Sequence, residues 1–167
     1  DRFLLIALMT AERAWAYAMQ LKEEANTEPR KKFHMQGRLR KAAKYAAALD
    51  AICQESAACD PMTKLEATAY AAWMSGVLAF EAQDWRAALD HLTKAQTIYE
   101  RLQEALTEED REPYLSRLAE LRPSLRFCAY NIGDSSAADD LRAMRGPEGA
   151  GLEHLIAQTR EKQASSE

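Results

Sequence analysis

Apolar side chains recur at helical intervals along most of the chain, and this pattern predicts an all-helical fold. In the first part of the sequence the recurring apolar positions are Leu5, Leu8, Met9, Trp15, Met19 and Leu21. Alternating runs of β-branched residues, which would indicate strands, are almost absent. The first predicted helix therefore covers residues 2–26.

Capping residues predict where the next helices begin. Thr27 is a candidate N-cap and Pro29 is tolerated in a first helical turn, which predicts a second helix ending near residue 55. Asp60 followed by Pro61 predicts a third helix that ends near residue 82. Asp84 predicts a fourth helix that ends near residue 105.

Two further helices are expected before a glycine. Thr107 opens a stretch that resembles a capping box, so a fifth helix should begin there. Pro123 is expected to break this helix and to start a sixth, which should end at Gly133.

The C-terminal part differs in composition. A short helix is expected over residues 137–144, followed by a Gly/Pro linker at 146–151 and an amphipathic segment at 152–162. The predicted organisation is a helical domain, residues 1–145, and a linker with a peripheral C-terminal helix, residues 146–167.

Helices joined by short turns are expected to pack as antiparallel pairs. One pair carries a more specific pattern, because small or apolar residues occupy the offsets of a tetratricopeptide repeat at Gly76, Ala88, Leu92 and Ala95. Trp85 follows Asp84 in the turn and should pack between the third and fourth helices. The prediction is an all-α antiparallel helical stack, tetratricopeptide-like, with chance spacing in an alanine-rich chain as the alternative.

Charge is distributed very unevenly. The net charge of -4 argues at first against a nucleic-acid partner. However, residues 30–44 hold seven Lys and Arg side chains, one His and no Asp or Glu, whereas the rest of the chain has a net charge of -11. The positive field of the protein is therefore concentrated on one segment.

With roughly 100° per residue, this segment forms an amphipathic helix. Met35, Leu39, Ala42, Ala43 and Ala46 share the apolar half. The other half carries most of what we call the basic face: Arg30, Lys31, Lys32, Phe33, His34, Gly37, Arg38, Arg40, Lys41, Lys44 and Tyr45.

Three members of the basic face need separate comment. Lys32 lies off the arc, in the first turn, where it can extend to solvent. Phe33 lies at the edge of the arc and could stack on a base or pack in the core. Gly37 lies within the arc, where the missing side chain would let a ligand backbone approach.

The single sign of charge indicates a polyanionic partner. Solvated helix faces usually mix signs because like charges at i,i+4 repel, yet Arg38 and Lys41 have no acidic residue three or four positions away. An acidic membrane surface fits less well, because the arc lacks a bulky apolar flank. Arg38 and Arg40 are the best candidates for bidentate contacts with a phosphate or a guanine edge.

Catalytic and metal-binding signals are weak. His34, His91 and His154 fall in different predicted helices without a nucleophile at motif spacing, so no enzyme is expected. Cys53, Cys59 and Cys128 form no CxxC pair, so neither a metal site nor a cofactor is expected. The longest apolar run, residues 3–9, is too short to cross a membrane. Because no starting Met is present, we expect a piece of a longer protein.

Several stretches resemble one protein family. They are AERAWAYAMQLKEEANTEPRKKFHMQGRLRKAAKYA, KLEATAY, FEAQDWRAALDHLTKAQTIYERL, CAYNIGD and LIAQTREKQ. Together they are similar to the RNA-binding domain of the sixty-eight-kilodalton subunit of the eukaryotic signal recognition particle. The alanine-rich stretch at 46–58 and the Gly/Pro linker depart from the pattern of that family.

The resemblance implies a tetratricopeptide-like module that binds the RNA of the particle at a structured junction through an arginine-rich helix, here residues 30–44. It implies a structural subunit of a co-translational targeting particle, with signal recognition particle RNA and other particle proteins as partners. The seventy-two-kilodalton partner would bind outside this stretch. Neither DNA nor membrane insertion is implied. The implied location is the cytoplasm, and a nucleolar stage of assembly is allowed.

A tetratricopeptide-like adaptor that binds acidic peptides is the competing interpretation. Such adaptors assemble a basic groove from several repeats, whereas this chain concentrates its charge on one helix. A rigid cationic helix suits structured RNA, because the major groove of an A-form duplex admits a helix only where a loop or junction widens it.

Overall fold

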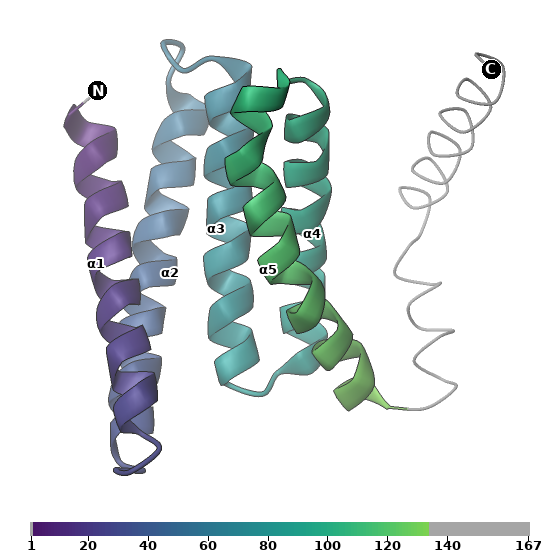
Figure 1. The fold of residues 1–167 in the computed structure, drawn as a ribbon. Coiled ribbons are helices and arrows are strands. Elements are labelled where there is room, and N and C mark those ends of the chain that lie inside the picture. The colour runs from purple at the N-terminus through teal and green to yellow at the C-terminus, as the bar shows by residue number, and fades with distance from the viewer. Residues whose placement is uncertain (1, 134–167) are drawn as a thin grey trace, which may run out of the picture. The chain divides into compact units, whose positions relative to one another are not determined.

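A computed structural model describes residues 2–133, which form five helices (Figure 1). They are α1 (Arg2–Glu24), α2 (Lys31–Glu55), α3 (Pro61–Glu81), α4 (Trp85–Glu104) and α5 (Glu108–Ile132). No strand occurs in this part of the chain, which confirms the all-α prediction. The helix expected at 137–144, the linker, the C-terminal segment and the domain boundary near residue 145 lie outside the described residues.

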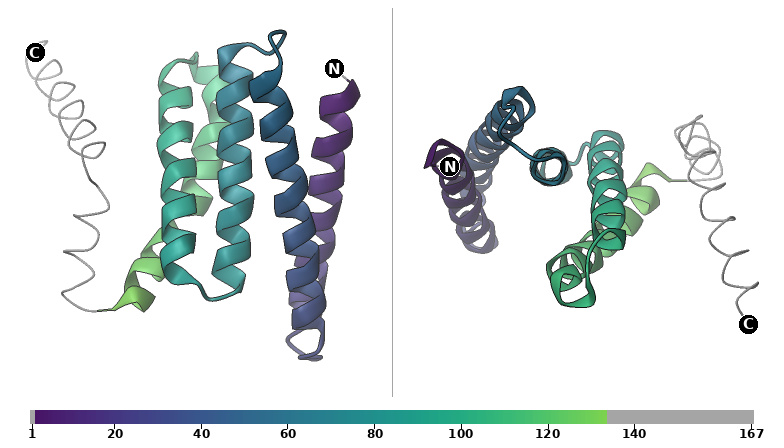
Figure 2. Two further views of the ribbon diagram at one scale, coloured as in Figure 1. Left: turned by 180° about the vertical axis from the view of Figure 1, so that it is seen from behind. Right: turned by 90° about the horizontal axis from the view of Figure 1, so that it is seen from above.

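Neighbouring helices run in opposite directions. Helix α2 packs between α1 and α3, and α3 packs in turn against α4 (Figures 1 and 2). The helical stack expected from the short turns is therefore confirmed for α1 to α4. Helix α5 lies on the side of α3 and α4 that faces the viewer in Figure 1.

Small residues form the contact between α1 and α2. The buried positions of α1 recur every three or four residues: Ala7, Ala11, Ala14, Ala18 and Leu21. The buried positions of α2 follow the same spacing: Met35, Leu39, Ala42, Ala46, Leu49 and Cys53. This spacing is typical of nearly parallel helix axes, and alanine lets the two backbones come close.

The α3–α4 contact has the close approach of a tetratricopeptide repeat. A Cβ atom at Gly76 would lie 2.5 Å from Cδ2 of Leu92 and 3.3 Å from its backbone nitrogen. Ala88 and Ala95 are fully buried on the same side of α4. At Gly76 the sequence pattern therefore reflects a real steric requirement.

Of the N-caps predicted for the second, third and fourth helices, two are present and one is not. The side chain of Asp60 accepts a hydrogen bond from the amide of Thr63 (2.9 Å), and Asp84 does the same for Ala87 (3.2 Å). Thr27, predicted to cap α2, instead donates its hydroxyl to the carbonyl of Glu24 at the end of α1 (3.0 Å). That prediction was wrong, because the side chain satisfies the preceding helix rather than the following one.

Pro123 does not break the fifth helix. Pro113 and Pro123 both lie inside a continuous α5, so no separate sixth helix begins at Pro123. An interior proline costs about 3 kcal/mol through the lost hydrogen bond and the ring clash. The helix continues because Leu118, Leu121 and Cys128, on both sides of Pro123, are buried in the core while Pro123 itself is exposed.

Trp85 joins three helices. Its ring meets Phe80 of α3 edge-to-face, with centroids 5.3 Å apart, and meets Phe127 of α5 at the same distance. Packing between the third and fourth helices is confirmed. The additional contact with Phe127 brings the C-terminal half of α5 against the α3–α4 turn.

Replacing each of two helical glycines with alanine should change stability in opposite directions. Gly37→Ala places a Cβ in open space and should stabilise the fold by about 0.5–1 kcal/mol, because alanine favours the helix. Gly76→Ala gains the same propensity but drives a methyl group into Leu92, and overpacking costs about 1–3 kcal/mol. Urea denaturation measures both changes. If Gly76→Ala were as stabilising as Gly37→Ala, α3 and α4 would not approach so closely.

Candidate nucleic-acid interface

Helix α2 presents the basic face because its opposite side is buried. Met35, Leu39, Ala42 and Ala46 are almost inaccessible to solvent and lie against the neighbouring helices. Ala43, expected in the same stripe, is half-buried. The narrow apolar stripe predicted from the sequence is thus the surface that fixes the rotation of α2 about its axis.

Most members of the basic face are exposed. Arg30 is exposed but lies in the turn before α2, and the exposed helical members are Lys32, Phe33, His34, Gly37, Arg40, Lys41 and Lys44. Arg38 and Tyr45 are half-buried. Lys32, placed off the arc by helical angles, is exposed with the others. Seen from behind, α2 lies in front of the C-terminal part of α1 (Figure 2, left).

Lys31 differs from the rest of the basic face because its charge is compensated. Its Nζ atom lies 2.7 Å from Oε2 of Glu24 and 3.1 Å from Oε1 of Glu28. The hydrogen bond to Glu24 is the main cause that raises the pKa of Lys31. This lysine therefore joins the end of α1 to the start of α2 and contributes less to the external field.

The remaining cations are not compensated by carboxylates. Within residues 2–133 no acidic side chain pairs with any of the other six basic residues of the face, which are Arg30, Lys32, Arg38, Arg40, Lys41 and Lys44. Lys41 makes an aromatic contact instead, with Nζ 5.9 Å from the centroid of the Tyr45 ring. An external anion can therefore bind without displacing an internal carboxylate.

Tyr17 of α1 extends the face beyond α2. The guanidinium carbon of Arg38 lies 4.8 Å from the centroid of the Tyr17 ring, and the ring of His34 meets Tyr17 edge-to-face at 5.3 Å. Arg38 also donates a long hydrogen bond from Nε to Nε2 of His34 (3.4 Å). Because the guanidinium group is oriented by a second helix, it is less free than the lysines around it.

Reasoning from the sequence did not find Tyr17. A signal exists, since an aromatic residue between the buried Ala14 and Ala18 must point away from the centre of the α1–α2 contact. However, the side of α2 that it faces depends on how the two helices are rotated and aligned. That information comes only from the packing.

Two residues of the basic face, Phe33 and Gly37, need separate mention because of their exposure. The side chain of Phe33 is 79% exposed, so Phe33 does not pack in the core. Of the two roles predicted for it, stacking on a base stays a prediction. A Cβ atom at Gly37 would meet nothing within 4 Å. Both positions are therefore open to solvent on the basic face.

Histidines and cysteines do not form a second site in the described part of the chain. His91 is exposed on α4, and His154 lies outside residues 2–133. Cys53, Cys59 and Cys128 are free thiols, and burial raises the pKa of Cys53 and Cys128. Across residues 2–133 no group of three His, Cys, Asp or Glu side chains is placed to hold a metal ion. None of the five helices is long and apolar enough to cross a membrane.

The fold and the face define an all-helical, tetratricopeptide-like module with a cationic helix surface. The family described as "RNA-binding signal recognition particle 68" matches residues 1–167. The chain belongs to this family, which confirms the resemblance seen in the sequence.

Individual relatives agree with this assignment. The chain is 47% identical over 165 residues to "Signal recognition particle subunit SRP68" of Drosophila melanogaster, a match that covers 96% of this chain and 27% of that protein. The protein of the same name in Caenorhabditis elegans is 39% identical over 178 residues, with 99% and 29% covered. The chain thus spans between a quarter and a third of the length of these relatives.

A solved structure supports the fold. The SRP68-RBD from Chaetomium thermophilum matches with a TM-score of 0.71 and 34% sequence identity, over 78% of this chain and 71% of that one.

A double-mutant cycle should detect the contact between Tyr17 and Arg38. Arg38→Ala combined with Tyr17→Leu should show a coupling free energy of about 0.5–1 kcal/mol, the usual range for an exposed cation–aromatic pair. The matched cycle between Tyr17 and Arg40 should show no coupling, because Arg40 makes no contact with the ring. Chemical denaturation of the single and double variants gives both coupling free energies. Equal coupling in the two cycles would mean that Arg38 does not contact the ring of Tyr17.

Proposed function

We propose that this chain binds the RNA of the signal recognition particle at a structured junction, as a structural subunit of the particle. The observation that carries the proposal is a set of six cations, on and beside one rigid helix, that pair with no carboxylate of residues 2–133. Membership of an RNA-binding family makes RNA the polyanion. The subunit role and the cytoplasmic location follow from the names of the relatives and belong to the proposal.

The geometry of the face favours a distorted RNA over a regular duplex. The major groove of A-form RNA is too narrow for a helix, so α2 can insert only where a loop or junction opens it. Arg40, Lys41 and Lys44 then contact phosphates on both walls of the opening. Arg38, oriented by Tyr17, makes the bidentate contact to a phosphate or a guanine edge.

The other partners of the particle are part of the same proposal. Other particle proteins assemble with the full-length subunit, and the seventy-two-kilodalton partner binds a portion outside this chain. The proposed function involves no catalytic activity, no cofactor and no DNA target. We also propose that assembly of the particle has a nucleolar stage.

An adaptor for acidic peptides is the weaker candidate. Such an adaptor needs its cations in the groove formed by alternate helices of the stack. Here the cations lie on the outer side of α2, whereas the hollow lined by α1, α3 and α5 carries Glu81 and Glu120. Both carboxylates are paired, with Lys22 and Arg117, so within residues 2–133 this hollow offers an acidic peptide no unpaired cation.

Salt dependence tests the proposed RNA contact. If about five cations meet phosphates, the slope of log affinity against log salt is roughly -4, and shallower where the RNA is unpaired. Arg38→Ala combined with Arg40→Ala should flatten the slope by about one to two units, because two counterion-releasing contacts are lost. Anisotropy titrations with a three-way-junction RNA and with an equally long duplex measure the slope, and the loss should be larger for the junction.

Two controls complete that experiment. Arg101→Ala combined with Arg126→Ala removes two exposed arginines elsewhere on the surface and should leave the slope unchanged. Leu39→Ala should cost about 2–5 kcal/mol of stability and affect binding only through unfolding. Junction binding that keeps its slope without Arg38 and Arg40 would place the RNA elsewhere.

Phe33 provides a separate test of base stacking. Phe33→Ala should leave the melting temperature nearly unchanged, because the ring is exposed. It should weaken binding to a junction with unpaired bases by about tenfold, since stacking on one base contributes about 1–3 kcal/mol. Phe33→Trp is the matched variant and should retain the affinity. Equal effects on the junction and on a plain duplex would contradict a stacking role.

A further inference from the structure

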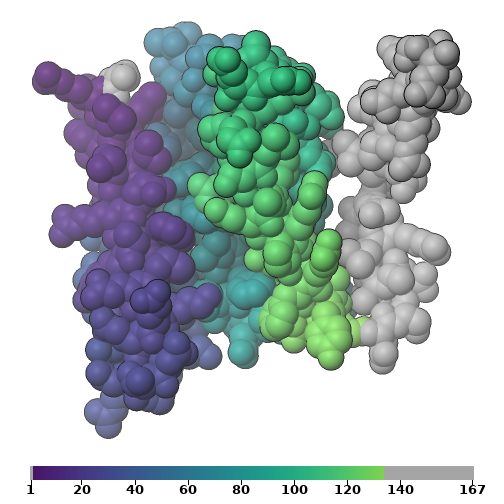
Figure 3. All heavy atoms as spheres, viewed as in Figure 1, coloured from purple at the N-terminus to yellow at the C-terminus, as the bar shows by residue number. Residues whose placement is uncertain are grey.

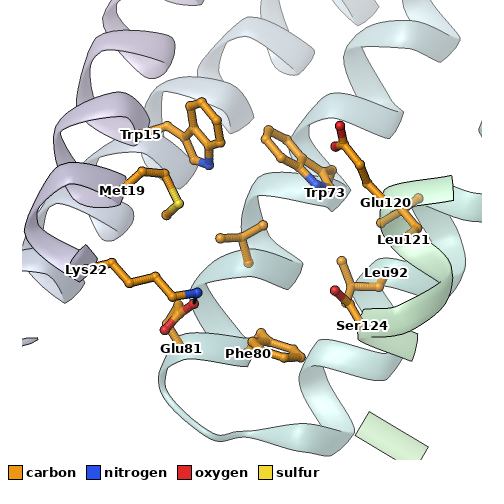
Figure 4. A pocket seen from close by; sticks show the side chains of 11 residues that line it. Trp15, Met19, Lys22, Trp73, Phe80, Glu81, Leu92, Glu120, Leu121 and Ser124 are labelled. Carbon is orange, nitrogen blue, oxygen red and sulfur yellow. Dashed lines mark hydrogen bonds and ion pairs between the residues drawn. The ribbon is translucent and has the colours of Figure 1, made fainter. Parts of the chain in front are cut away.

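A second candidate surface lies on the side of the protein away from the basic face. A hollow of about 200 Å³ is lined by side chains of α1, α3 and α5, with one contribution from α4 and none from α2 (Figure 4). Figure 3 shows this side, with α1 and α5 in front and α3 set back between them. We call it the aromatic groove and define it by Trp15, Met19, Trp73, Val77, Phe80 and Leu121.

Helical geometry separates this groove from the basic face. Trp15 and Tyr17 are two residues apart on α1 and therefore point roughly 200° apart. Tyr17 contacts Arg38 of the basic face, whereas Trp15 lines the groove. The buried contact through Ala14 and Ala18 lies between the two directions, so a ligand on one face leaves the other face accessible.

The floor of the groove is aromatic and already holds one cation. The rings of Trp15 and Trp73 lie 5.6 Å apart in a tilted arrangement. The guanidinium carbon of Arg117 lies 4.1 Å from the centroid of the Trp73 ring, beside the groove. Aromatic side chains of this kind provide large contact areas and attract positive charge to their faces.

The rim and its surroundings carry more carboxylates than cations. Glu81 pairs with Lys22, and Glu120 pairs with Arg117 (3.2 Å). Beyond them, Glu12 of α1 accepts a hydrogen bond from the hydroxyl of Tyr70 (2.6 Å), whose ring lies 6.0 Å from that of Trp73. Because a tyrosine donor is neutral, the carboxylate of Glu12 keeps its charge.

Size and charge together decide the class of ligand. A hollow of about 200 Å³ is smaller than the roughly 300–1,000 Å³ that enclose a cofactor or drug-sized molecule, but it can take the anchoring side chains of a peptide. Glu81 and Glu120 are each paired with a cation, so the charge of Glu12 leaves the groove and its surroundings net negative, which favours lysine or arginine next to those anchors. We propose that the aromatic groove binds a basic, amphipathic segment of a partner protein.

Two synthetic peptides test this proposal. One is a fluorescent 14-residue helix of leucine and lysine, and the other has glutamate in place of every lysine. The lysine peptide should bind the chain with one-to-one stoichiometry, and the glutamate peptide at least ten times more weakly. Equal binding of the two peptides, or no binding of the lysine peptide, would overturn the proposal.

Variants locate the binding on the surface. Glu12→Gln combined with Glu81→Gln should weaken the lysine peptide about three- to tenfold, because it removes the carboxylate without a cation and frees Lys22 to repel the peptide. Lys22→Gln should strengthen it, because it leaves Glu81 unpaired. Glu23→Gln combined with Glu55→Gln removes two exposed carboxylates outside the groove and serves as the matched control. A loss in the control as large as that in the groove variant would mean non-specific attraction.

Two more variants separate the groove from folding and from the RNA face. Val77→Trp should block the groove and abolish peptide binding. Circular dichroism shows whether this variant keeps the fold, and if the fold is lost, the Glu→Gln variants decide whether the groove binds the peptide. Arg38→Ala combined with Arg40→Ala should keep full peptide affinity, because those residues lie on the basic face. The peptide result therefore stands or falls independently of RNA binding.

Discussion

The close contact between α1 and α2 is the constraint on which the rest of the structure depends. Ala18 of α1 clusters with Met35 and Leu39 of α2, Ala7 clusters with Leu49 and Cys53, and small side chains let the backbones approach. This contact fixes the rotation of both helices. Because α2 is held through its narrow apolar stripe, Arg40, Lys41 and Lys44 face solvent. Because α1 is held through its alanines, Tyr17 and Trp15 point to opposite sides of the helix pair. A larger residue at Ala11 or Ala18 would separate the helices and disturb both surfaces together.

The consequence is a separation of charge within a small domain. The outer side of α2 and the turn before it hold six cations that pair with no carboxylate of residues 2–133. The groove formed by α1, α3 and α5 is bordered by Glu81 and Glu120, each paired with a cation. Repulsion among the cations lowers the free energy of unfolding by a few tenths of a kcal/mol per neighbouring pair. The buried side of α2 offsets this loss, because each fully buried leucine or methionine contributes about 1.5–3 kcal/mol of stability. The fold can therefore keep a surface that is slightly unfavourable alone and favourable with a polyanion.

Helix α5 shows how packing overrides local signals. Pro123 is a strong helix-breaking signal, and the sequence alone favours two helices there. The apolar residues before and after Pro123 are nevertheless buried in one core, and together they outweigh the cost of about 3 kcal/mol for one interior proline. The same helix brings Phe127 to Trp85 and Leu121 to the aromatic groove. A break at Pro123 would have removed this side of the groove.

The sequence by itself determined the first four helices and the start of the fifth, the caps at Asp60 and Asp84, the close approach at Gly76 and the basic face of α2. All of these depend on spacing within one helix or one turn, or on small residues whose only use is close contact. Only the tertiary structure decided that Thr27 serves α1, that Phe33 is exposed, that Lys31 is paired with Glu24 and that Tyr17 orients Arg38. These depend on how one helix is rotated and aligned against another. That alignment is set by the summed packing of many side chains, and no local pattern in the sequence contains it.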